Sequence, residues 1–180
     1  TLLFVGPVLS DGISAMAHAT SPDSLLVAAG SSVYRYVRGH EVAKYNTSVA
    51  DEGIEGHVLS SMLVFGDYVC SLAAHGSTMY VWSLLTTELL QAIALPSSSQ
   101  ASCFMHPATY LNKVVLGMTD GSLQLWNVRT ASLIHTFDAL DVRGGKKSTN
   151  VTGVVHMTQS PAVDVLAVAY TDGLVSLFDV

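Results

Sequence analysis

Hydrophobic and polar residues alternate along this chain in short runs that favour β-strands. The clearest example is residues 113–128, KVVLGMTDGSLQLWNV, where an apolar run stops at Thr119-Asp120-Gly121 and a second run alternates Leu123, Leu125 and Val128 with polar residues. An Asp-Gly turn between two such runs predicts a β-hairpin, because glycine adopts positive φ without steric cost and aspartate tolerates it. No useful window shows the 3.6-residue periodicity of a helix, so we expect an all-β chain.

The same hairpin pattern occurs four times. Each copy carries an aromatic residue near the end of its second strand, and this residue follows a glycine by five or six positions. An apolar strand lies ahead of each glycine. The aromatic residues are Tyr36, Trp82, Trp126 and Phe178, which are 46, 44 and 52 residues apart, and the glycines are Gly30, Gly76, Gly121 and Gly173.

Two further strands can be assigned to each copy. Predicted inner strands begin near Ile13, Val58, Ala101 and Val151, and predicted outer strands follow the aromatic residue as EVAKY, ELLQAI and SLIHTF. The segment TLLFVG at the start of the sequence has the same outer character. A repeat of roughly 40–45 residues with four short strands is typical of a β-propeller blade. We therefore expect about four WD-type blades, at residues 1–45, 46–91, 92–137 and 138–180, with a polar insertion at residues 138–150.

Four blades lie at the low end of the range of about 4 to 8 seen in propellers. An unclosed ring would expose two apolar sheet faces, so we expect these 180 residues to be part of a larger ring. Hydrophobic residues make up 49% of the chain, charged residues 12%, and the mean hydropathy is +0.43. This composition suits strands that are buried on both faces. No apolar run approaches 18 residues, so no membrane contact is expected.

The net charge of −6, with only eight lysines and arginines, argues against a nucleic-acid-binding surface. The one basic cluster, Arg143, Lys146 and Lys147, lies in the polar insertion. Two interpretations stay open for it: a solvated loop, or a contact to an acidic partner or RNA phosphate, since long loops in compact repeats are often functional.

Several residues match positions that hold WD-type blades together through buried hydrogen bonds. These positions are a histidine before the inner strand, a serine in the second strand, a tryptophan in the third strand and an aspartate in the hairpin turn. The second copy has His75 where the aspartate is expected. We predict structural roles for His57, Ser71, Trp82, Asp120, Trp126, Asp172 and Phe178.

The sequence gives little support for a catalytic or metal-binding site. No G-x-S-x-G elbow positions a nucleophile, and the seven histidines are scattered without metal-ligand spacing. Cys70 and Cys103 do not form a C-x-x-C pair and fit a reducing compartment. We expect no enzyme activity, no cofactor, no metal and no small-molecule substrate.

Residues 106–128, HPATYLNKVVLGMTDGSLQLWNV, followed by SLIHTF and by residues 160–180, resemble one family in particular. This is the WD-repeat tandem-propeller family of the small-subunit processome, the snoRNA-associated protein twenty-one family of the UTP-B subcomplex. The resemblance covers roughly residues 57–180 and is looser before them. Residues 138–150 depart from the compact linker of that family.

The resemblance implies a non-catalytic scaffold in the nucleolus. Its implied partners are the other WD-repeat proteins of UTP-B and, mostly indirectly, the pre-rRNA and snoRNA particle. Its implied role is in 18S pre-rRNA processing and small ribosomal subunit assembly. The alternative is a WD-repeat scaffold of another complex, such as a ubiquitin-ligase adaptor or a trafficking subunit. A propeller hydrolase would need carboxylates or histidines at the channel mouth, whereas the inner strands offer mainly serine, methionine and histidine.

Overall fold

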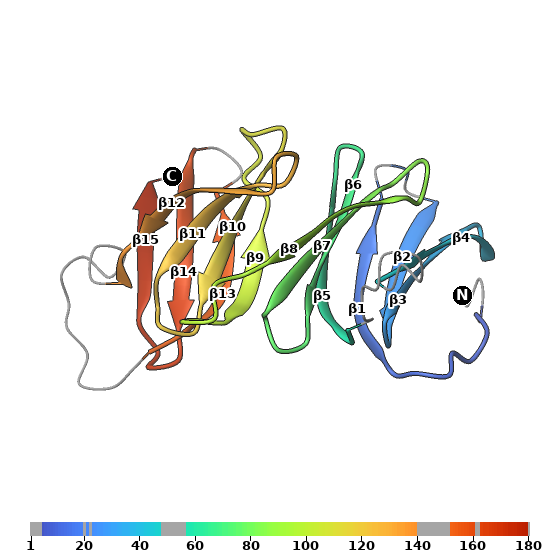
Figure 1. Ribbon diagram of the computed structural model, residues 1–180, viewed down its shortest axis with the longest axis horizontal. Coiled ribbons are helices and arrows are strands. Elements are labelled where there is room, and N and C mark those ends of the chain that lie inside the picture. The colour runs from blue at the N-terminus through green and yellow to red at the C-terminus, as the bar shows by residue number, and fades with distance from the viewer. Residues whose placement is uncertain are drawn as a thin grey trace. The chain divides into compact units, whose positions relative to one another are not determined.

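The computed structural model describes residues 5–19, 21, 23–47, 57–139, 152–160 and 163–179. Within these residues the chain forms four antiparallel sheets of consecutive strands, as Figure 1 shows. Residues 57–137 contain strands, turns, bends and irregular segments but no helix. The prediction of an all-β chain is therefore confirmed.

The chain divides into two compact units, residues 1–94 and 95–180. Unit 1 contains sheet 1, formed by β1 (Ile13–His18), β2 (Ser24–Ala29), β3 (Ser32–Val37) and β4 (His40–Asn46). It also contains sheet 2, formed by β5 (Leu59–Phe65), β6 (Tyr68–Ala73), β7 (Thr78–Ser83) and β8 (Leu89–Ala94). In both sheets the strand order in space follows the order along the chain.

Unit 2 contains sheet 3 and sheet 4. Sheet 3 consists of β9 (Ala101–Met105), β10 (Lys113–Met118), β11 (Leu123–Asn127) and β12 (Ser132–Phe137). Sheet 4 consists of β13 (Val154–Gln159), β14 (Val165–Tyr170) and β15 (Val175–Asp179). Among the described residues this sheet has three strands, one fewer than the four expected for each copy of the repeat.

The predicted hairpin between β10 and β11 is present. Its strands pair antiparallel from Lys113 opposite Asn127 to Gly117 opposite Leu123. Gly121 in the turn has φ of 87°, and the three equivalent glycines, Gly30, Gly76 and Gly173, also have positive φ. The glycine that precedes each aromatic residue is therefore the residue that allows each tight turn between the second and third strands.

The predicted strand TLLFVG is not supported in its described part, Val5 and Gly6, which lie outside any strand. Residues 1–4 lie outside the described residues. Pro7 follows directly, and proline lacks the N–H group that a strand needs for pairing. The polar insertion, apart from Asp138 and Ala139, also lies outside the described residues.

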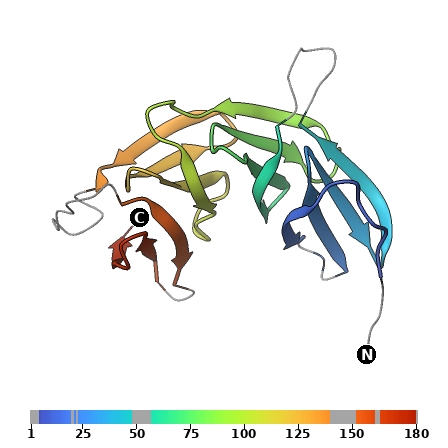
Figure 2. The ribbon, with the colours of Figure 1, turned by 90° about the horizontal axis from the view of Figure 1, so that it is seen from below.

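The hydrophobic core of each unit lies between its two sheets. In unit 1, β1 lies beside β5, and in unit 2, β9 lies beside β13 (Figure 2). The middle strands of sheet 3 are buried on both faces: Val114, Val115 and Leu116 of β10 are all fully buried although they point alternately to opposite faces. This burial explains the high apolar content of the sequence.

Candidate interaction surfaces

Two aromatic residues of the third strands, Trp82 and Phe178, lie where the two sheets of a unit meet. In unit 1, the ring of Trp82 packs edge-to-face on Tyr45 of β4, with centroids 6.4 Å apart, and its indole N–H donates to the carbonyl oxygen of Asn46 over 2.9 Å. In unit 2, Phe178 packs edge-to-face on Phe137 of β12, with centroids 4.9 Å apart. Each aromatic side chain therefore contacts the last strand of the preceding sheet.

The WD-type positions of sheet 2 each bond to a residue outside that set. A ring nitrogen of His57 hydrogen-bonds to the hydroxyl of Tyr80, and the hydroxyl of Ser71 donates to the carbonyl oxygen of Ser61 over 2.5 Å. Trp82 bonds to Asn46 as described, and His75 is exposed in the turn. The structure thus buries Ser71 and Trp82 but gives them separate partners, and the structural roles assigned from sequence stay predictions.

The remaining predicted blade residues make local contacts. Asp120 accepts hydrogen bonds from the backbone N–H and the hydroxyl of Ser122, at 2.9 and 2.6 Å, and Asp172 accepts one from the backbone N–H of Leu174 at 3.1 Å. These aspartates close their own turns, a common use of this side chain. Trp126 is buried, and its indole N–H donates to the amide oxygen of Gln124 on the same strand over 3.0 Å.

The two thiols are held in protonated form. Burial raises the pKa of Cys70 well above its ordinary range and raises the pKa of Cys103 to about 11. Because the thiolate is the reactive species, neither side chain is suited to nucleophilic attack near neutral pH. Among the described residues no three histidine, cysteine or acidic side chains are grouped to hold a metal, and no helix there could cross a membrane.

Four basic side chains in the described part of the chain have partners within it. Arg35 donates to Ser24 and to the carbonyl oxygen of Leu84, and Arg38 pairs with Asp23 at 3.0 Å. The ammonium groups of Lys44 and Lys113 lie over the rings of Tyr34 and Tyr110, at 5.1 and 4.0 Å from the centroids. The sequence-predicted basic cluster, Arg143, Lys146 and Lys147, lies outside the described residues.

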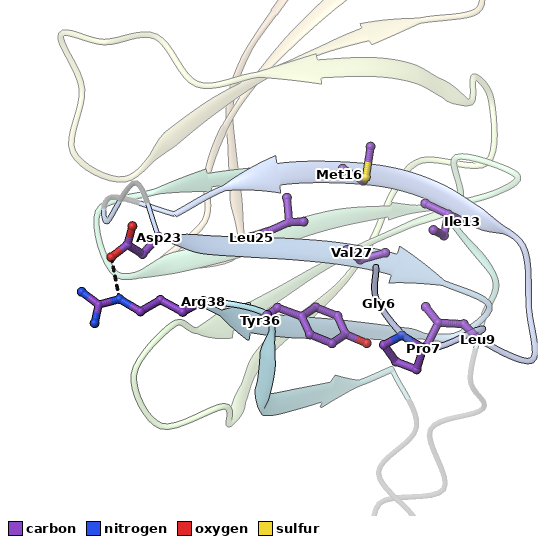
Figure 3. Close-up of a pocket in the computed structure, with 11 residues that line it drawn as sticks. Gly6, Pro7, Leu9, Ile13, Met16, Asp23, Leu25, Val27, Tyr36 and Arg38 are labelled. Atoms are coloured by element: carbon purple, nitrogen blue, oxygen red, sulfur yellow. Dashed lines mark hydrogen bonds and ion pairs between the residues drawn. The ribbon is translucent and has the colours of Figure 1, made fainter. Parts of the chain in front are cut away.

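One candidate binding surface is a hollow on sheet 1, on the face turned away from sheet 2. This hollow, shown in Figure 3, has a volume of about 370 Å³. Tyr36 lies close to Pro7 in the close-up, and the ion pair of Asp23 and Arg38 lies toward the other end. The lining is otherwise mainly apolar and suits a hydrophobic surface rather than a charged ligand. It consists of Gly6, Pro7, Leu9, Ile13, Met16, Asp23, Leu25, Val27, Tyr36, Arg38 and Gly39.

A second candidate surface is the loop between β9 and β10, residues 106–112. The ring of His106 bonds to the carbonyl oxygen of Lys113 over 2.8 Å, and the backbone N–H of Ala108 donates to the side chain of Gln159 over 2.7 Å. Leu111 is 89% exposed on this braced loop. The sequence pointed to this segment through its resemblance to a family and not as a contact surface. The signal that could have indicated a contact surface was a leucine within a largely polar loop.

Comparison with known proteins identifies one family across the whole chain. The family model described as the WDR36/Utp21 first beta-propeller matches residues 1–180. The U3 small nucleolar RNA-associated protein 21 homolog of Schizosaccharomyces pombe is 34% identical over 184 residues, covering 99% of this chain and 18% of that protein. WD repeat-containing protein 36 of Homo sapiens is 37% identical over 117 residues, covering 64% and 12%. The chain therefore spans less than a fifth of these relatives.

Solved structures match the fold. The crystal structure of the computationally designed Ika4 protein aligns with a TM-score of 0.71 at 18% identity, covering 100% of this chain and 98% of that one. The computationally designed Ika8 protein aligns with a TM-score of 0.63 at 19% identity, covering 93% of this chain and 46% of that one. The β-propeller fold expected from the repeat is confirmed by the family match and by the four antiparallel sheets.

Proposed function

This chain belongs to the WDR36/Utp21 family, in the region of its first β-propeller, and from this premise we propose that it is a non-catalytic scaffold of the small-subunit processome. The role proposed is in 18S pre-rRNA processing and small ribosomal subunit assembly, in the nucleolus. The observation that carries the proposal is the match of the family model to all 180 residues. The name of the fission-yeast relative, a protein associated with U3 small nucleolar RNA, supports the same process.

The proposed mechanism is geometric. Sheets with continuous cores hold their connecting loops in fixed positions, and rigid loops lose little conformational entropy when a partner binds. The loop at residues 106–112 is such a feature, because polar contacts to Lys113 and Gln159 brace it while Leu111 faces solvent. We propose that loops of this kind contact other WD-repeat proteins of the UTP-B subcomplex.

Charge supports docking on protein more than on RNA. The chain has a net charge of −6, and four of its basic side chains, Arg35, Arg38, Lys44 and Lys113, already have internal partners. Affinity for nucleic acid grows with the number of phosphates that free lysines and arginines neutralise. We therefore propose that contact with the pre-rRNA and snoRNA particle through this segment is mostly indirect.

The proposal is tested by depleting the full-length protein and measuring ribosomal RNA and sedimentation. We expect the protein to sediment with large pre-ribosomal particles, and its loss to lower 18S rRNA while 25S or 28S rRNA stays nearly constant. Unchanged 18S rRNA after depletion would contradict the proposed function.

A second variant separates protein docking from RNA docking. Replacing Arg143, Lys146 and Lys147 together with glutamine should weaken association with the particle only modestly, because few phosphate contacts are lost. Leu111→Lys should weaken it more if the braced loop contacts protein. Complete loss of association in the triple variant would instead identify the basic cluster as an RNA anchor.

A further inference from the structure

One residue lies at an equivalent place in each of the four sheets, directly before the second strand. In the first three sheets its backbone carbonyl accepts a hydrogen bond from the turn between the third and fourth strands. The acceptors are Asp23, Asp67 and Asn112, and the donors are the N–H groups of Arg38, Leu84 and Val128, over 3.1, 2.8 and 2.9 Å. In sheet 4, Asp164 directly precedes β14. The position is therefore an aspartate in sheets 1, 2 and 4 and an asparagine in sheet 3.

The asparagine of sheet 3 leaves an arginine without a counter-charge. In sheet 1, the carboxylate of Asp23 pairs with the guanidinium of Arg38 over 3.0 Å. The corresponding turn of sheet 3, between β11 and β12, carries Arg129, which is exposed. Asn112 has no charge to pair with it, and among the described residues Arg129 has no ion-pair partner.

Sheet 3 carries a second positive charge at the same end. Lys113 begins β10, and its ammonium group lies over the ring of Tyr110, which attracts the charge without neutralising it. The one acidic residue among residues 95–137 is Asp120, in the turn at the opposite end of β10. The neighbouring loop of sheet 4 carries Asp164, whose carboxylate already accepts a hydrogen bond from Gln159 over 3.2 Å.

An exposed apolar side chain lies beside these charges. Leu111, which precedes Asn112, is 89% exposed, and hydrogen bonds of His106 and Ala108 fix the loop that carries it. Two cations and one leucine on fixed loops suit a protein segment that brings carboxylates and an apolar side chain. They suit RNA less, because affinity for nucleic acid depends on neutralising many phosphates.

We propose that residues 106–113 and 127–131, the loops at this end of sheet 3, bind an acidic segment of a partner protein. Carboxylates of this segment contact Arg129 and Lys113, and an apolar side chain contacts Leu111. The inference rests on the proposed scaffold function and adds the chemistry of the partner. It also gives a reason for the asparagine of sheet 3, because an aspartate there would neutralise the charge that the segment binds.

The first experiment couples amines to carboxylates in the complex purified through the full-length protein. A carbodiimide joins a lysine directly to an aspartate or glutamate in contact with it, and mass spectrometry identifies the pair. We expect Lys113 to be coupled to an acidic residue of another protein, and an Arg129→Lys variant to be coupled to the same segment. Arg38→Lys is the matched control, because its amine should be coupled to Asp23 of its own chain. If the control reacts and neither of the first two positions is coupled to another protein, the proposal is overturned.

The second experiment restores the residue that the other three sheets have. Asn112→Asp should raise the dissociation constant for a synthetic peptide of the coupled segment at least about ten-fold at about 0.1 M salt, and Arg129→Gln should do the same. The effect should shrink at 1 M salt, where the Debye length falls from about 10 Å to about 3 Å. Arg38→Gln removes the same charge from sheet 1 and should leave the dissociation constant unchanged.

An unchanged dissociation constant in Asn112→Asp would overturn the proposal, and so would tighter binding of an oligouridine than of the peptide, which would identify an RNA-binding surface. Thermal melting checks that the variants are folded, and Lys113→Gln replaces any variant that is not. Neither experiment measures 18S rRNA, so a failure of this surface is distinguishable from a failure of the proposed function.

Discussion

In unit 1, the interface between sheets 1 and 2 contains hydrogen bonds from three large side chains to backbone carbonyls. In unit 2, one small side chain makes such a bond across the interface between sheets 3 and 4, from the hydroxyl of Ser102 to the carbonyl oxygen of Val154, and the rest of this interface is mainly apolar. In unit 1, Tyr45 and Arg35 donate to the carbonyl oxygen of Leu84, at 3.0 and 3.2 Å, and Trp82 donates to that of Asn46. In unit 2, the corresponding contact is the ring pair of Phe137 and Phe178, within a cluster of aliphatic side chains and Tyr170.

Equivalent positions show where the two interfaces diverge. Arg35 pairs with Leu26 in sheet 1, and Leu125 pairs with Val115 at the same register in sheet 3. The arginine is accommodated because the hydroxyl of Ser24 and the carbonyl oxygen of Leu84 accept its hydrogen bonds. The difference shows that the repeat specifies which positions are buried between sheets, whereas the residue at such a position can be polar in one interface and apolar in the other.

The largest expected effect is at the tryptophan of unit 1. Trp82→Ala should lower the free energy of unfolding by about 3–5 kcal/mol, because it empties a fully buried site and leaves the carbonyl oxygen of Asn46 without its indole donor. Phe178→Ala in unit 2 should lower the free energy of unfolding by less, because Phe178 is only partly buried and its loss leaves no hydrogen-bond partner unsatisfied. Urea unfolding at one protein concentration measures both, and equal costs would remove the distinction between the interfaces.

Trp82→Phe serves as the matched control for this prediction. It keeps an aromatic ring against Tyr45 and removes the indole N–H, so that the site has a ring pair without a hydrogen bond, like the site of Phe178. We expect it to lose roughly a third to a half of the stability that Trp82→Ala loses, since part of the cost is the unsatisfied carbonyl.

The fold could be predicted from sequence because its determinants are local. Turn glycines at a regular distance from an aromatic residue gave the repeat, and all four of them have positive φ. Gly117 was not explained by sequence, since it lies inside β10; a Cβ there would come within 2.6 Å of Val154 and 2.8 Å of the sulfur of Cys103. Its role is close approach of sheet 4, which only the tertiary structure shows.

Hydrogen-bond partners in the predicted blade positions could not be read from the sequence. The sequence predicted structural roles for His57, Ser71 and Trp82 without naming their partners, which are Tyr80, Ser61 and Asn46. Asn46 lies 36 residues before Trp82 and on another sheet, so its backbone carbonyl leaves no trace in the residue pattern. Exposed apolar side chains on sheets 1 and 4, such as Met16 and Leu177, agree in contrast with the expectation that a blade without a neighbour exposes an apolar face.

A smaller effect is expected from the polar contacts of unit 1 taken one at a time. Arg35→Leu should cost about 1–2 kcal/mol, because it removes two charge-assisted hydrogen bonds but buries apolar surface as Leu125 does. Tyr45→Phe should cost about 1 kcal/mol, because only the hydroxyl is lost.

The double variant sharpens the comparison. Either single change leaves the carbonyl oxygen of Leu84 with one donor, whereas both together remove the two donors described for it. The double cost should therefore exceed the sum of the single costs, which a double-mutant cycle of unfolding measures. Strict additivity would show that these hydrogen bonds are independent and that water replaces them without penalty.

The smallest expected effect concerns the thiol of unit 2. Cys103 lies at the core between sheets 3 and 4, and burial raises its pKa to about 11. An unfolded thiol titrates near 8.5, so the folded chain binds the proton more tightly, and the free energy of unfolding should fall as pH rises from about 9 to 11.

In a Cys70→Ala background, alkylation of native Cys103 at pH 8 should be about a hundred-fold slower than in the unfolded chain, because much less thiolate is present in the folded chain. The Cys103→Ala variant should lose the fall in stability at alkaline pH that this thiol causes. Sheet 1 has Ala15 at the same register, and alanine does not titrate. A native rate within a few-fold of the unfolded rate would show that the interface of unit 2 opens readily, and would reverse the view that its apolar packing is continuous.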